Sequence, residues 1–123
     1  MKLKFAVLAI DTADIKLLAD FYTTILDWQI LDEDDEWITI HDPQNPSATA
    51  IAFQFAPDHV PPTWPDNAIP QQAHIDFTVS DLDEAEAFVL AAGARSTGMP
   101  TAEGLNFRVY LDPSGHPFCL CQR

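Results

Sequence analysis

The chain has 123 residues, of which 47% are hydrophobic and 20% are charged, a composition typical of a single globular domain. Six Lys and Arg residues stand against 19 Asp and Glu residues, which gives a formal charge of −13. Proteins that bind nucleic acid or anionic membranes neutralise phosphate with clustered basic residues, so this composition argues against both partners.

The first predicted element is a strand in the apolar run 5–10, which ends at Asp11. This run is shorter than the apolar segment of a secretory signal, and no other run approaches the ~20 residues of a membrane-spanning helix. We therefore expect a cytoplasmic protein with no membrane partner. Residues 13–26 follow with apolar side chains at helical spacing, and Thr12 is the candidate N-cap of this predicted helix.

Two strand-like segments complete the first half, WITIH (37–41) and TAIAFQFA (49–56). The acidic run DEDDE (32–36) that precedes them is typical of a solvent-exposed hairpin turn. A proline-rich stretch, 57–72, comes next. Because proline lacks an amide donor and favours extended backbone, we interpret this stretch as a semi-rigid connector.

The second half repeats the order of the first. QAHIDFTVSDLDEAEAFV (72–89) aligns with FAVLAIDTADIKLLADFY (5–22), and FRVYLDP (107–113) aligns with WITIHDP (37–43). The aligned segment predicts a helix over 81–92, with Ser80 as N-cap and Gly93 as terminator. The sequence therefore predicts one α+β domain, 1–123, built from two tandem β-α-β-β-β modules, 4–56 and 73–122.

The strands of these modules have one apolar and one small or polar face. Side chains alternate across a strand, so the apolar residues of 74–79 should cover the helix, which leaves His74 and Asp76 on the opposite side. The same alternation places Gln54 and Cys119 opposite the helix in their own strands. Such faces make a poor core and predict a cavity enclosed by a curved sheet. A half-solvated sheet with ordinary outward polar residues is the alternative.

The doubled pattern, with HxxxxxxD at 74–81, DxxxAxxF at 81–88 and DPxG at 112–115, resembles the vicinal oxygen chelate superfamily. This superfamily includes glyoxalases, bleomycin-resistance proteins and ring-cleaving dioxygenases. The resemblance covers residues 4–122 and implies that the two modules form an eight-stranded, curved mixed sheet of the glyoxalase/bleomycin-resistance fold. It also implies a homodimer, because members of the family commonly dimerise.

Metal-using members hold a divalent ion with one leading-strand and one terminal-strand residue from each half. The resemblance places these positions at Val7 and Gln54, and at His74 and Cys119. Only His74 is of the expected ligand type, and the neutral amide of Gln54 is a weak ligand, so no cofactor is expected, with a divalent Zn, Ni, Mn or Fe ion as the open alternative. A softer zinc site would join His74 and Cys119 with Gln54 or Cys121, whereas the simpler interpretation is buried cysteines beside a cavity histidine.

The two cysteines are expected to be free thiols. Side chains two residues apart in a strand leave it in parallel about 7 Å apart, so Cys119 and Cys121 cannot easily join. A nucleophilic Cys119 would need a pKa lowered by a nearby cation, and the chain offers few cations. Which residue would be catalytic therefore stays open.

Further residues complete the predicted ligand-binding set. His74 and Asp76 share a face and can act as an orienting pair or a general base, with a hydrogen bond from a neighbouring strand or water to Asp76 as the alternative. Trp37 and Phe107 occupy equivalent repeat positions. Trp64, in the connector, either roofs the cavity or packs in the core or at a subunit interface.

Three functions remain. The first is a small-molecule-binding protein of the bleomycin-resistance type, for which the acidic charge would steer a cationic ligand, although solubility alone explains that charge more simply. The second is a glyoxalase-like lyase or isomerase with an atypical metal site around His74. The third is a ring-cleaving dioxygenase, whose iron needs two His and a carboxylate. One good ligand among four positions favours the first, and whether the chain is an enzyme stays open.

Overall fold

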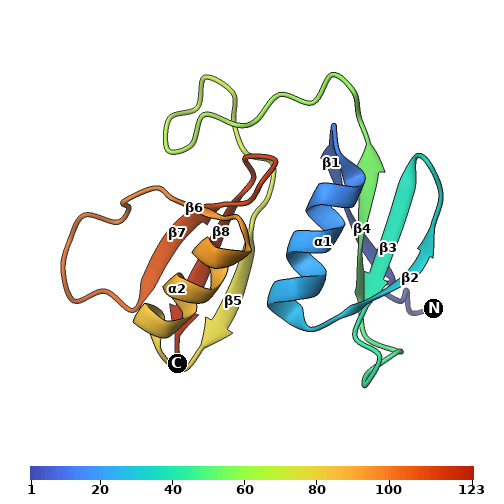
Figure 1. Cartoon of the computed structure of the whole chain (residues 1–123), viewed down its shortest axis with the longest axis horizontal. Coiled ribbons are helices and arrows are strands. Elements are labelled where there is room, and N and C mark those ends of the chain that lie inside the picture. The colour runs from blue at the N-terminus through green and yellow to red at the C-terminus, as the bar shows by residue number, and fades with distance from the viewer. The chain divides into compact units, whose positions relative to one another are not determined.

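The computed structural model describes residues 1–123 and divides them into two compact units, Met1–His59 and Val60–Arg123. Each unit has the order β-α-β-β-β and forms its own four-stranded mixed sheet (Figure 1). The α+β class and the two repeated modules are confirmed, with the eight strands divided into two hydrogen-bonded sheets. Neither helix combines the length and the apolar character that crossing a membrane requires.

The first unit places one helix over a sheet with the strand order β1-β4-β3-β2. Only the pair of β1 and β4 is parallel. The helix packs on β3 and β4, where the ring of Tyr22 stacks on that of Phe53 at 5.6 Å between centroids. The elements are β1 (Val7–Thr12), α1 (Ile15–Leu26), β2 (Gln29–Glu33), β3 (Trp37–His41) and β4 (Ala50–Phe55).

The second unit repeats this topology with the strand order β5-β8-β7-β6, in which β5 and β8 are parallel. Its helix contacts β8, and the ring of Phe118 lies between those of Phe77 and Tyr110 at 5.9 and 5.7 Å. The elements are β5 (Ile75–Val79), α2 (Leu82–Ala92), β6 (Arg95–Ser96), β7 (Phe107–Leu111) and β8 (Pro117–Gln122).

Both helices begin with an aspartate cap. The Asp14 carboxylate accepts from Leu17 N, and the Asp81 carboxylate accepts from Glu84 N, each at 3.0 Å. The predicted N-caps Thr12 and Ser80 are therefore wrong by two residues and one residue. An aspartate both satisfies a free amide and places negative charge at the helix N-terminus, which explains its preference here. The predicted terminator Gly93 is confirmed at φ 121°.

The predicted alternation of faces is also confirmed in β5. Ile75, Phe77 and Val79 are partly buried, whereas His74 and Asp76 are exposed. In β8 both faces are buried, because the helix covers one face and aromatic side chains cover the other.

Two contacts within the second unit hold the proline-rich connector. Thr63 N donates to Ile69 O at 2.8 Å and closes a short loop around Trp64. Gly115, at φ +86°, approaches Pro61 so closely that an added Cβ would lie 2.6 Å from the proline Cβ. Gly115 belongs to the predicted turn at Asp112, whose buried carboxylate accepts from the amides of Ser114 and His116.

Candidate functional site

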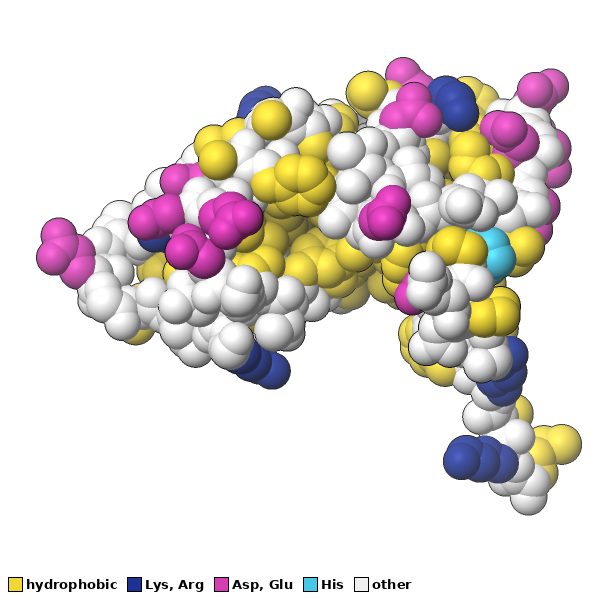
Figure 2. Space-filling model, turned by 60° about the horizontal axis from the view of Figure 1, so that its bottom comes forward, with side chains coloured by type: hydrophobic (Ala, Val, Ile, Leu, Met, Phe, Trp, Pro, Cys, Tyr) yellow, Lys and Arg dark blue, Asp and Glu magenta, His cyan; other side chains and the backbone are white.

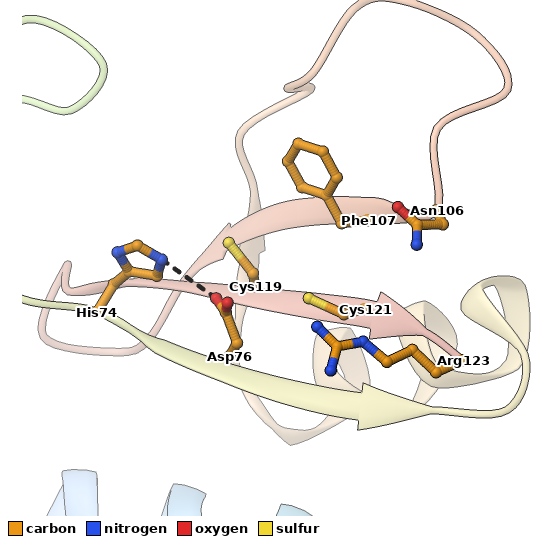
Figure 3. A pocket seen from close by; sticks show the side chains of 7 residues that line it. All are labelled: His74, Asp76, Asn106, Phe107, Cys119, Cys121 and Arg123. Atoms are coloured by element: carbon orange, nitrogen blue, oxygen red, sulfur yellow. Dashed lines mark ion pairs between the residues drawn. The ribbon is translucent and has the colours of Figure 1, made fainter.

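A cavity of about 300 Å³ lies on the side of the second sheet opposite α2 (Figure 3). The parallel register places Asp76 beside Cys119 and Thr78 beside Cys121, so residues of two neighbouring strands point to the same side. Of the predicted site residues, four meet here: His74, Asp76, Phe107 and Cys119. The full lining is His74, Asp76, Asn106, Phe107, Cys119, Cys121 and Arg123.

Three side chains with metal-binding or acid–base chemistry meet at one end of this cavity. His74 Nε2 lies 3.1 Å from Asp76 Oδ1, and one ligand atom from each of His74, Asp76 and Cys119 lies within 4.8 Å of the other two. The His74 and Asp76 side chains are 42% and 54% exposed, whereas Cys119 is buried. A molecule or ion in the cavity can therefore reach all three groups without unfolding the sheet.

The thiols are protonated at neutral pH. Burial, followed by a hydrogen bond to the Asp76 carboxylate and its negative charge, raises the pKa of Cys119 to about 12. Burial and the same carboxylate also raise the pKa of Cys121. Both cysteines are free, as predicted. Because the thiolate is the reactive species, this site does not activate Cys119 as a nucleophile.

Aromatic side chains shield the thiols. Val109, Cys119 and Cys121 form a small buried cluster, and the rings of Trp64 and Phe107 pack against it. Of these two rings, Phe107 lines the cavity and Trp64 covers the cluster from the connector. This arrangement favours packing as the role of Trp64.

The other two predicted site residues, Trp37 and Gln54, are neighbours in the first unit. They are paired across β3 and β4. The indole Nε1 of Trp37 donates to Thr39 Oγ1 at 2.7 Å, so its polar group already has a partner. Gln54 is exposed near the end of β4.

The strand register shows which residues of the two modules occupy equivalent positions, and this matching differs from the one made by sequence comparison. Leu8 pairs with Ile51 as Ile75 pairs with Phe118, so Ala9 and Ala52 correspond to Asp76 and Cys119. Gln54, which the sequence comparison matched with Cys119, corresponds instead to Cys121. The residue that matches Cys119 is Ala52, two positions earlier in β4. The turn between β3 and β4 is longer than the turn between β7 and β8. Sequence alone does not show how many of the extra residues belong to the turn, so it does not fix the register of the strand that follows.

Sequence reasoning missed two residues that line the cavity, Asn106 and Arg123. Arg123 follows Cys119 and Cys121 at alternating positions, so strand periodicity could have found it. Its amide donates to Val79 O at 3.1 Å, which extends the strand pairing to the last residue. Asn106 precedes β7 and accepts through its backbone oxygen from Gln122 N at 2.7 Å. Asn106 carries no sequence signal, because it lies in an irregular loop.

The model of the glyoxalase-like domain matches residues 7–121, which is nearly the whole chain. The chain belongs to the glyoxalase-like domain family. This family lies within the vicinal oxygen chelate superfamily, so the resemblance stated from sequence is confirmed. No functionally curated sequence matches this glyoxalase-like protein significantly.

Solved structures share the fold of this glyoxalase-like protein. A glyoxalase/bleomycin resistance protein/dioxygenase family enzyme from Burkholderia phytofirmans PsJN is 17% identical with a TM-score of 0.72, and the match covers 98% of each chain. Leishmania major glyoxalase I, described as trypanothione-dependent, is 19% identical with a TM-score of 0.70, covering 98% of this chain and 87% of its own. A glyoxalase family protein from Enterococcus faecalis is 17% identical with a TM-score of 0.69 over 98% and 97%.

The metal that the family often uses does not fit the residues at the family positions. The first module offers Val7 on its leading strand, and the register places Ala52 on its terminal strand. Neither side chain has a donor atom. The second module offers His74 and Cys119, so a glyoxalase-like ion shared evenly between two halves has half of its ligands missing.

Proposed function

We propose that this glyoxalase-like protein binds a small molecule in the cavity of its second module. The observation that carries the proposal is the lining itself, in which an imidazole, a carboxylate, an amide and a guanidinium converge beside an aromatic ring. Small-molecule sites typically combine apolar walls with a few polar groups that fix orientation. This cavity combines them within one compact unit.

The dimensions and charges of the cavity define a class of ligand. A volume of about 300 Å³ lies at the lower end of the range of known sites, roughly 300–1,000 Å³. The ligand is therefore a compact molecule with an apolar part against Phe107 and hydrogen-bonding groups toward Asp76. Figure 2 shows Asp and Glu side chains spread over several parts of the visible face. A cationic group is accordingly favoured by the long-range attraction of the acidic surface. Within the cavity, Asp76 attracts such a group and Arg123 repels it.

A binding screen in the presence of chelator tests this proposal. Compounds of about 20 heavy atoms or fewer, in cationic, anionic and neutral sets, are screened by thermal shift, and hits are measured by calorimetry. We expect Asp76→Asn and Phe107→Ala to weaken binding about tenfold each, since one charged hydrogen bond or one aromatic contact contributes about 1.5 kcal/mol.

Two exposed positions provide matched controls, Asp35 in the acidic turn and Phe88 on α2. Asp35→Asn and Phe88→Ala make the same chemical changes away from the cavity and should leave affinity unchanged. Equal losses in the control and cavity variants would reject the cavity as the binding site.

A metal-dependent lyase or isomerase of the glyoxalase type is the second candidate function. The clustering of His74, Asp76 and Cys119 donor atoms within 4.8 Å supports it. It predicts turnover of a cavity ligand that chelator abolishes and added metal restores. Binding without turnover under both conditions favours the metal-free binding protein.

A further inference from the structure

The two modules differ at three equivalent positions in a way that concerns metal binding. β1 and β4 share the register of β5 and β8, so the positions can be matched residue by residue. In the second module these positions carry an imidazole, a carboxylate and a thiol, from His74, Asp76 and Cys119. In the first module all three carry apolar side chains: Val7, Ala9 and Ala52. At these positions, only the second module therefore has side chains that can bind a metal ion.

The donor atoms are already close to the separations that a tetrahedral ion requires. Zinc bonds of about 2.0–2.3 Å place neighbouring donors about 3.3–3.6 Å apart. His74 Nε2 and Asp76 Oδ1 are 3.1 Å apart, and all three ligand atoms lie within 4.8 Å of one another. Side-chain rotation over about 1 Å therefore suffices to surround an ion, and the strand backbones need not move.

The chemistry of the three donors selects a borderline metal. A thiolate and an imidazole favour zinc-type ions over magnesium or calcium, which prefer oxygen ligands. When the ion binds, the Cys119 proton is released to solvent, and one thiolate and one carboxylate then balance the charge of a divalent ion. Three protein ligands with a fourth position open to the cavity are typical of zinc sites that admit a further ligand.

We propose that the second module alone binds one zinc-type divalent ion through His74, Asp76 and Cys119. In metal-using members of the family each module supplies two ligands. The ligand set proposed here differs, because all three ligands come from the second module and Asp76 stands in for those that the first module lacks. The site supports the metal-dependent candidate function and shares His74, Asp76 and Cys119 with the cavity of the proposed small-molecule site. Metal binding is therefore measured without any organic ligand.

Cobalt titration of the full, untagged, chelator-treated protein tests the proposal. Co²⁺ is the probe because a thiolate ligand gives it a charge-transfer absorption band in the near ultraviolet. We expect one Co²⁺ per chain with this band, and its displacement by one equivalent of Zn²⁺. We expect Asp76→Asn and His74→Ala each to weaken affinity more than about 100-fold, since even residues that only support ligands change it 10–100-fold.

The two cysteines provide a matched pair of variants. Cys119 and Cys121 lie on the same strand face, line the same cavity and are both buried. The band should disappear in Cys119→Ser and persist in Cys121→Ser, with circular dichroism confirming that both variants fold. Asp76→Asn changes an exposed side chain, so its effect on affinity does not depend on folding.

Three results would overturn the proposal: no stoichiometric cobalt binding by the unmodified protein, a band that persists in Cys119→Ser, or a band that is lost in Cys121→Ser. Affinity unchanged by Asp76→Asn would equally reject this ligand set. Failure of metal binding leaves the small-molecule proposal standing, because that proposal is tested in chelator.

Discussion

At the scale of single residues, Asp76 interacts with both the imidazole of His74 and the thiol of Cys119. Its carboxylate lies against His74 and accepts from the Cys119 thiol, whose pKa it helps to raise. Strand alternation predicted that His74, Asp76 and Cys119 share a face, because side-chain direction follows from chain position. It did not predict that Asp76 would adjoin Cys119, since that contact depends on the register between β5 and β8.

Alkylation of Cys119 should be slow at neutral pH. With the pKa raised to about 12, the thiolate fraction grows about tenfold per pH unit from pH 7 to 10. In metal-free Cys121→Ser protein, where Cys119 is the remaining thiol, the rate of iodoacetamide labelling measured by mass spectrometry should follow this slope. Asp76→Asn should accelerate labelling by removing a cause of the raised pKa. A rate that levels off near pH 8 would show that the thiol is not held neutral.

At the scale of elements, the repeated module was predictable from sequence, and the details of its edges were not. Helix 13–26 and helix 81–92 were located by apolar spacing, yet their caps shifted to Asp14 and Asp81 because capping depends on which oxygen reaches a free amide. The sequence did not predict that the connector packs on the turn at Gly115, because this packing depends on a contact between Gly115 and Pro61, which are far apart in the chain.

Two glycine variants measure how strongly this connector is held. Gly115 and Gly104 both have positive φ, 86° and 78°, but an added Cβ meets Pro61 only at Gly115. Gly104→Ala should cost about 1 kcal/mol of unfolding free energy from backbone strain alone. Gly115→Ala should cost at least about 1 kcal/mol more, because Pro61 and the connector must shift. Equal denaturation midpoints for the two variants would mean that the contact with Pro61 adds nothing.

At the scale of the whole molecule, family membership and the duplicated fold are established, whereas the assembly state is a proposal. We propose a homodimer on the basis of the family resemblance. Sedimentation equilibrium should then give twice the chain mass of 13.7 kDa at micromolar concentration. A mass equal to one chain over the whole concentration range would contradict the dimer.

The proposed function requires the cavity of the second module to bind a compact ligand. Amide chemical-shift mapping of the uniformly ¹⁵N-labelled protein with a confirmed hit tests it most directly. We expect the largest shifts at the residues that line the cavity, namely His74, Asp76, Asn106, Phe107, Cys119, Cys121 and Arg123. Shifts confined to the first unit, or scattered evenly over both units, would contradict it.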